Sequence, residues 1–281
     1  MHVTAIEAFE IALLGMSAGL IGGLAGIGGS LIMIPGLIFL LGYDDDAHTQ
    51  QHVFMAAAMV VNFLVAAPSA LRHHKSKVVR LDVARYLIPT MMCAILVGVL
   101  LSDRIEGSHL KNALAVFMMI YSITNLWRAW QRYQQRKHNP EASAQEEQSQ
   151  QMQHRIAVAP IIGIGALTGL IAGLLGIGGG LIMVPLLLIA LRLPLRQAIG
   201  TSSAVMCLTA LVGSALKLWN LAPEHGREAS EALTYAILMG PTASVGAWFG
   251  AHLMHKLPLQ TVRVIISVLL IVGALKMLGV F

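Results

Sequence analysis

Two clusters of glycine, each inside a long apolar stretch, are the residues of this chain best suited to chemistry. The first is Gly26-Ile27-Gly28-Gly29, which Ser30 follows, and the second is Gly176-Ile177-Gly178-Gly179-Gly180. Glycine inside a helix costs roughly 1 kcal/mol relative to alanine. Each cluster therefore predicts a helix break, or a close approach of a ligand or another backbone. At a break, the free N–H groups of a helix N-terminus can bind an anion without a charged side chain.

Four polar side chains in apolar stretches are candidates for the same chemistry. Thr201, Ser202 and Ser203 can donate hydrogen bonds to an anion, and helix N-capping is their alternative role. Asn62 lies mid-stretch, where a buried amide needs partners, either a substrate or another helix. The candidate substrate-binding residues are thus Gly26, Gly28, Gly29, Ser30, Asn62, Gly176, Gly178, Gly179, Gly180, Thr201, Ser202 and Ser203.

The glycine clusters belong to an internal repeat. Gly19–Pro35 reads GLIGGLAGIGGSLIMIP and Gly169–Pro185 reads GLIAGLLGIGGGLIMVP, with 13 of 17 positions identical at an offset of 150 residues. Later landmarks also align, such as Pro89 with Pro241 and Gly98 with Gly250, so the repeat covers nearly the whole chain. Small residues also let membrane helices pack closely, which is the alternative interpretation of the glycines. Two clusters in equivalent positions favour a site.

The composition is that of a membrane protein. Hydrophobic residues make up 56% of the chain and charged residues 12%, half the share in a soluble domain. Apolar stretches of 18 or more residues recur, which predicts an all-α polytopic protein that spans the lipid bilayer. The apolar N-terminus is part of the repeat, so we do not expect a cleaved signal peptide. Cys93 and Cys207 lie in apolar segments, which makes a structural disulfide unexpected.

Each half contains four apolar blocks, and the first is too long for one straight helix. Residues 5–42 would form a helix ~57 Å long, nearly twice the ~30 Å hydrocarbon core. We therefore predict two shorter helices joined at the glycines, as a hairpin or a re-entrant pair, followed by three transmembrane helices. The glutamine-rich stretch at 131–155 is predicted to be a flexible or partly helical cytoplasmic linker. The domains are then the repeat 1–130, the linker 131–155 and the repeat 156–281.

Basic residues in short loops predict the orientation of the chain. Five of them lie between Arg72 and Arg85 and others flank the linker, so both regions should face the cytoplasm. If the first block of each half crosses twice, each half makes five crossings and the halves are inverted. If it crosses once, they are parallel. The length of the block favours inverted repeats, which together with broken helices are typical of secondary transporters.

The glycine motif resembles that of the TauE/SafE sulfite exporter family, also called the toluene sulfonate uptake permeases. Gly173–Pro185, GLLGIGGGLIMVP, fits best, and the first copy departs at Ser30, where the family usually has a third glycine. Gly200-Thr201-Ser202-Ser203 is similar to the family's G-T-S element, whereas the first half has Met55-Ala56-Ala57-Ala58. The resemblance implies transport of sulfite, sulfonates or related organosulfur anions.

We therefore predict a secondary transporter that exports small sulfur-containing anions such as sulfite or organosulfonates by alternating access. A channel-like anion conduit, an uptake permease for another small oxyanion and a non-transporting membrane scaffold are the alternatives. No Cys, His and carboxylate set has zinc-like spacing, and no nucleotide-binding or nucleophile motif occurs. We accordingly predict no metal, no cofactor, no nucleic-acid partner and no enzymatic activity, while the oligomeric state stays open.

Overall fold

The computed structural model describes residues 4–42, 50–138, 157–221, 226–254 and 259–280, and the regular structure in these ranges is helical throughout. This confirms the predicted all-α class. Residues 43–49 and most of the predicted linker lie outside the described residues. The helices are α1 Ala5–Ala25, α2 Ser30–Leu41, α3 Gln50–Lys75, α4 Leu81–Ser102, α5 Gly107–His138, α7 Val158–Leu175, α8 Gly180–Ile189, α9 Leu195–Leu221, α10 Gly226–Leu253 and α11 Leu259–Met277.

Five of these helices are long and apolar enough to cross a membrane: α1, α3, α4, α7 and α9. Many of their large apolar side chains face outward, including Leu13, Leu20, Val97 and Leu208. Such exposure would be costly in water but is expected against lipid. The chain is thus a multi-pass membrane protein.

The first apolar block of each half is broken at its glycines, as predicted. α2 has 12 residues and α8 has 10, so each is ~15–18 Å long, about half the hydrocarbon core. α2 folds back along α1, because a Cβ atom on Gly36 would lie 2.8 Å from the Cδ2 atom of Leu14. In the same way Gly179, at the start of α8, lies beside Thr168 and Ala172 of α7. Each pair is therefore a helical hairpin with a half-length second arm.

Stripes of glycine join the two halves of the chain. Gly15, Gly19 and Gly23 lie on the face of α1 that packs against α10, and Gly165, Gly169 and Gly173 on the face of α7 that packs against α4. A Cβ atom on Gly15 would lie 2.6 Å from the carbonyl oxygen of Met239, so the backbones are in contact. Because these glycines have no side chains, the helices of the two halves can approach closely within the membrane.

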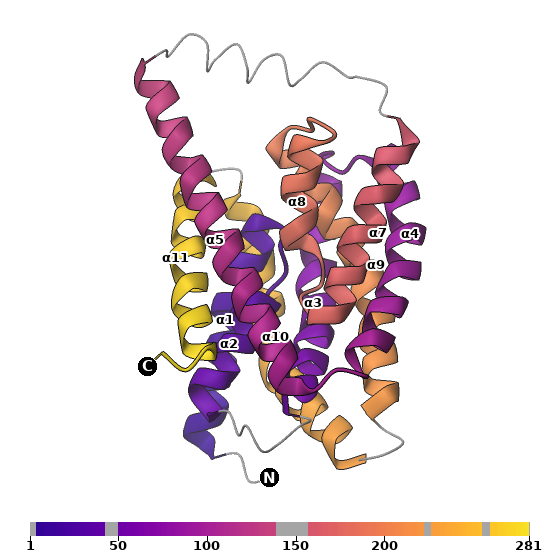
Figure 1. Ribbon diagram of the computed structural model, residues 1–281, viewed down its shortest axis with the longest axis vertical. Helices are drawn as coiled ribbons and strands as arrows, with labels where there is room; N and C mark the ends of the chain where they lie inside the picture. The colour runs from indigo at the N-terminus through magenta and orange to yellow at the C-terminus, as the bar shows by residue number, and fades with distance from the viewer. Residues whose placement is uncertain (1–3, 43–49, 139–156, 222–225, 255–258, 281) are drawn as a thin grey trace.

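The remaining helices form the centre and one side of the bundle. α3 and α9 pack against each other in the middle, while α5 and α11 pair on the left of Figure 1. α1 begins at the lower end of the molecule in this view and α7 begins at the upper end (Figure 1). α5 continues to His138, eight residues beyond Trp130, because its polar residues are mostly good helix formers. Residues 131–138, at the start of the predicted linker, are therefore helical.

Candidate functional site

The two breaks lie where α1 passes into α2 and where α7 passes into α8. We call residues 26–29 the first break and residues 176–179 the second break. Backbone φ lies between +66° and +83° at five of their glycines: Gly26, Gly28, Gly176, Gly178 and Gly179. Residues with a Cβ atom rarely adopt this left-handed conformation, so the breaks depend on glycine at these positions.

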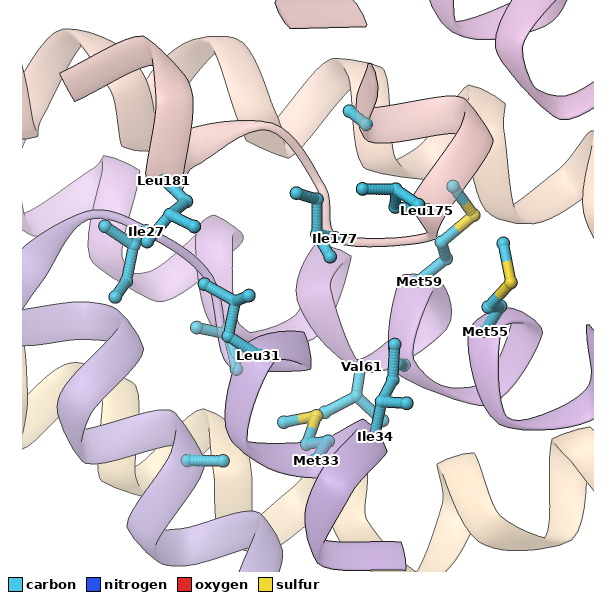
Figure 2. Close-up of a cluster of buried hydrophobic side chains, with 14 of the residues drawn as sticks. Ile27, Leu31, Met33, Ile34, Met55, Met59, Val61, Leu175, Ile177 and Leu181 are labelled. Carbon is cyan, nitrogen blue, oxygen red and sulfur yellow. The ribbon is translucent and has the colours of Figure 1, made fainter. Parts of the chain in front are cut away.

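The breaks touch each other through their backbones. A Cβ atom on Gly180, the first residue of α8, would lie 2.5 Å from the carbonyl oxygen of Gly26 and 2.7 Å from the Cα atom of Ile27. Figure 2 shows Ile27 of the first break beside Leu181 of α8, with Ile177 of the second break nearby. Ile27 and Ile177 are both buried. The halves therefore meet, glycine against glycine, in the interior of the bundle.

Asn62 of α3 lies between the two breaks and is fully buried. Its Oδ1 atom accepts hydrogen bonds from the N–H groups of Gly29 at 2.8 Å and Ser30 at 3.1 Å. The side chain thus caps the N-terminus of α2 from another helix. Its Nδ2 atom faces the second break, because a Cβ atom on Gly178 would lie 2.6 Å away. Within the described residues this Nδ2 atom has no acceptor.

The start of α8 has no such cap. Its N-cap residue, Gly179, has no side chain, and no described side chain accepts a hydrogen bond from the N–H groups of Gly179 or Gly180. The Sδ atom of Met206 lies beside Gly180. The Cγ2 methyl of Thr168 lies beside Gly179, where an added Cβ atom would be 3.1 Å from it. The donors at a helix N-terminus carry partial positive charge, so this end is open to an anionic acceptor.

Of the three consecutive hydroxyls only Ser202 reaches a break. Its Oγ atom donates to the carbonyl oxygen of Gly26 at 2.9 Å. Thr201 Oγ1 instead accepts from the N–H group of Arg80 at 3.0 Å, and Ser203 Oγ accepts from Ser69 Oγ at 3.3 Å. The N-capping alternative is wrong for all three, because α9 already begins at Leu195 and they lie within it.

Two further hydroxyls near the breaks are buried without a hydrogen-bond partner in the described chain. They are Ser30 Oγ, at the first residue of α2, and Thr168 Oγ1, on α7. With Asn62 Nδ2 they are three unpaired polar atoms close to the half-helix N-termini. Unpaired buried polar groups are uncommon and costly, so these three atoms are candidates for contact with a polar ligand. Thr168 is not among the residues predicted from the sequence, although it lies directly before the repeated motif that starts at Gly169.

The arrangement supplies neutral hydrogen-bond donors and helix dipoles rather than charged side chains. Ten of the predicted site residues are brought together at the breaks: the glycines, Ser30, Asn62 and Ser202. Thr201 and Ser203 face the α3–α4 side of α9 instead. Within the described residues, no group of three His, Cys, Asp or Glu side chains could hold a metal ion. Chemically, the region can hold a small anion by hydrogen bonds alone.

Several curated proteins resemble the chain along most of its length. The probable membrane transporter protein YunE of Bacillus subtilis is 24% identical over 96% of this chain and 98% of its own. A probable membrane transporter protein of Haemophilus influenzae is 27% identical over 94% and 96%. The probable membrane transporter protein MamO of Magnetospirillum gryphiswaldense is 27% identical over 95% of this chain, which spans only 44% of that relative's length.

The family comparison covers the whole bundle. No solved structure shows a significant match to the chain. The family model described as "Sulfite exporter TauE/SafE" matches residues 11–277, which include both breaks and all ten helices in whole or in part. The chain therefore belongs to the sulfite exporter TauE/SafE family of membrane transporters.

Proposed function

We propose that the protein is a secondary transporter that exports small sulfur-containing anions, such as sulfite or organosulfonates, across the bacterial plasma membrane by alternating access. One observation carries the proposal: two half-helix N-termini and the amide of Asn62 meet in the buried centre of a membrane bundle. Membership of a transporter family and the printed names of the relatives support it. The family description, sulfite exporter, supports the class of substrate.

The proposed site uses both breaks unequally. The N–H groups at the start of α8 are unoccupied by side chains, whereas those at the start of α2 are capped by Asn62. We place the anion at the α8 end, within reach of the free Nδ2 atom of Asn62. Hydrogen bonds to a charged acceptor contribute about 1.5–3 kcal/mol each, so three or four would contribute roughly 4.5–12 kcal/mol before the entropic cost of association.

The breaks are closed in this conformation. Gly180 and Gly26 are in contact, so an anion can enter only if the halves separate at this point. A conduit that is permanently open would need a gap here, and for this reason we favour a carrier over a channel. Export of a negative charge from a cell with a negative interior gains ~2.3 kcal/mol per 100 mV, which can drive the flux without a coupled ion.

We also propose that the halves are inverted repeats that rock against each other. Two features support this: α1 and α7 begin at opposite ends in Figure 1, and α1 packs on α10 as α7 packs on α4. Gly42 follows α2 and Arg192 follows α8 at equivalent positions, 150 residues apart. Cysteines placed there should react with a membrane-impermeant maleimide from opposite sides. Labelling of both from one side would rule out inversion.

Purified protein in liposomes tests the function directly. The assay measures flux of 35S-labelled sulfite, thiosulfate, sulfoacetate and taurine, with sulfate as a comparison anion. We expect saturable uptake of at least one sulfur anion, stimulated when the same unlabelled anion is loaded inside. Flux that does not saturate and shows no such counterflow would favour the channel. No flux and no thermal stabilisation by any of the anions would contradict the transport proposal.

A further inference from the structure

A cluster of ionisable side chains far from the breaks is buried at the end of the bundle where α3 begins and α9 ends. Lys217 of α9 is fully buried, although lysine is among the residues that proteins almost never bury without a partner. Its ammonium group donates to His52 Nδ1 at 2.8 Å, to Ser102 Oγ at 2.9 Å and to the carboxylate of Asp103. All three ammonium hydrogens therefore have acceptors, and three helices are tied together by one side chain.

These contacts determine the protonation state of His52. Its Nδ1 atom faces an ammonium donor and must accept, so it carries no proton. Its Nε2 atom lies 3.1 Å from the carbonyl oxygen of Ile105 and must donate. The ring is thus the neutral Nε2–H tautomer. With a cationic Lys217 and an anionic Asp103, the cluster has no net charge.

We propose that His52 is a proton-binding site, and that a proton bound there detaches Lys217 from α3 and opens this end of the bundle. The proton adds to the Nδ1 lone pair, so the hydrogen bond from Lys217 is lost and two cations face each other. Asp103 Oδ1 lies 3.9 Å from His52 Nδ1 and is the nearest carboxylate oxygen for the new N–H group. The carboxylate then moves from Lys217 toward the imidazolium, and the cluster gains one positive charge.

The surroundings offer a path for the proton and few competing charges. The side chain of Asp103 is 27% exposed, whereas that of Lys217 is fully buried, so protons reach His52 along the Asp103 side. Asn220 Nδ2 donates to the second oxygen of Asp103 at 2.5 Å, which leaves Oδ1 as the oxygen that faces both Lys217 and His52. Other ionisable groups on neighbouring elements already have partners. Glu106, just before α5, pairs with His109 at the start of α5. Glu231 accepts a hydrogen bond from Tyr235 on α10, and Glu7 of α1 accepts one from the N–H group of Thr4.

The repeat supplies an internal comparison. Ser214-Ala215-Leu216-Lys217 of α9 matches Ser69-Ala70-Leu71-Arg72 of α3 at an offset of 145 residues, and the same offset pairs His52 with Gln197. Arg72 also contacts a histidine, His252 of α10, at 2.7 Å. Near their C-terminal ends, α3 and α9 thus each carry a cation in contact with a histidine. Among the described residues, only Lys217 also contacts a carboxylate, that of Asp103. The residue equivalent to His52 in the other half, Gln197, has a side chain that does not titrate, which makes glutamine the natural replacement to test at position 52.

The inference rests on the proposed transport function for its purpose, but its test needs no substrate. The variant H52Q keeps an acceptor for Lys217 and cannot titrate, and H109Q is the matched control, because His109 is 74% exposed at the same end. Protein with 15N-labelled histidine is titrated in lipid nanodiscs from pH 8 to pH 3, because the buried, cation-facing imidazole should bind its proton only in acid. We expect one signal, absent from H52Q, to start as the Nε2–H tautomer and to become imidazolium in acid. A signal that starts as the Nδ1–H tautomer, or that does not titrate, overturns the proposal.

A distance measurement tests the opening. Spin labels on cysteines replacing Arg104, after α4, and Trp219, on α9, report the separation of the two helix ends in a background lacking Cys93 and Cys207. In the parent and in H109Q the separation should widen over the pH range in which the His52 signal titrates. In H52Q it should stay constant. Equal widening with and without His52 overturns the proposal. Absence of anion flux in liposomes would instead contradict the transport function, so the two failures are distinguishable.

Discussion

Replacement of Asn62 separates its structural role from its proposed role in binding. Its Oδ1 atom accepts two backbone hydrogen bonds at the start of α2, in a fully buried position. Asn62→Ala removes the one acceptor of both hydrogen bonds, and each buried N–H group left unsatisfied costs ~1–3 kcal/mol. A helix cap alone is worth ~0.5–2 kcal/mol. We therefore expect Asn62→Ala to lower the stability by about 2–4 kcal/mol.

Asn62→Asp has nearly the same shape and keeps an acceptor for both N–H groups. A carboxylate at a helix N-terminus is favourable by ~0.3–1 kcal/mol and keeps both N–H groups paired, which offsets part of the cost of burying the charge, so the variant should be more stable than Asn62→Ala. The new charge, however, would lie ~4 Å from the proposed anion, where repulsion costs ~4 kcal/mol at an effective dielectric constant of ~20. Since ~1.4 kcal/mol is a factor of ten, anion affinity should fall ~1,000-fold.

Thermal unfolding in nanodiscs and titration calorimetry with sulfite measure the two effects. Asn125→Asp, the same chemical change on α5, is the matched control and should alter neither. The reasoning is refuted if Asn62→Asp binds sulfite like the parent. It is also refuted if Asn62→Asp unfolds as easily as Asn62→Ala, because the cap would then not depend on the acceptor.

The other predictions concern the hydroxyls and the glycines. Ser202→Ala should weaken anion affinity roughly tenfold in calorimetry, since it removes the hydrogen bond to the first break. Thr201→Ala should leave binding unchanged, because Thr201 contacts Arg80 instead. The opposite order of effects would place the anion elsewhere. Gly178→Val should lower the unfolding temperature sharply, because the φ of Gly178 is +70° and a Cβ atom there would meet the amide of Asn62. Gly163→Val is the control and should be tolerated, since a Cβ atom on Gly163 meets nothing within 4 Å. Gly169→Leu should also be destabilising in the same assay, by forcing α7 away from α4, and a stable variant would show that the glycine stripe is dispensable.

The breaks could be predicted from the sequence because they follow from length and local conformation. A block of 38 residues does not fit the bilayer as one helix, and only glycine readily takes the positive φ values found at Gly26 and Gly176. Asn62 could be selected for a similarly local reason, as an amide inside an apolar stretch. Its position between the two breaks could not be predicted, because it depends on how α3 packs against both hairpins.

The hydroxyls show where local patterns mislead. Thr201, Ser202 and Ser203 are adjacent in sequence, but successive residues of a helix point ~100° apart, so only one of them faces the first break. Lys217 was missed because it lies near the end of an apolar block, where a lysine usually extends to the membrane surface. Its burial comes from His52 and Asp103, more than 100 residues away in sequence, which no periodicity reveals.

Solute counterflow in liposomes that contain the parent or Asn62→Asp tests the central claim most directly, namely that the meeting point of the two breaks is the anion site of a transporter. The liposomes are loaded with unlabelled sulfite, and entry of labelled sulfite is followed at alkaline pH. We predict transient accumulation of label by the parent, and none by Asn62→Asp although it is folded. Flux through the parent equal to that of empty liposomes, or equal counterflow by the two proteins, would contradict the claim.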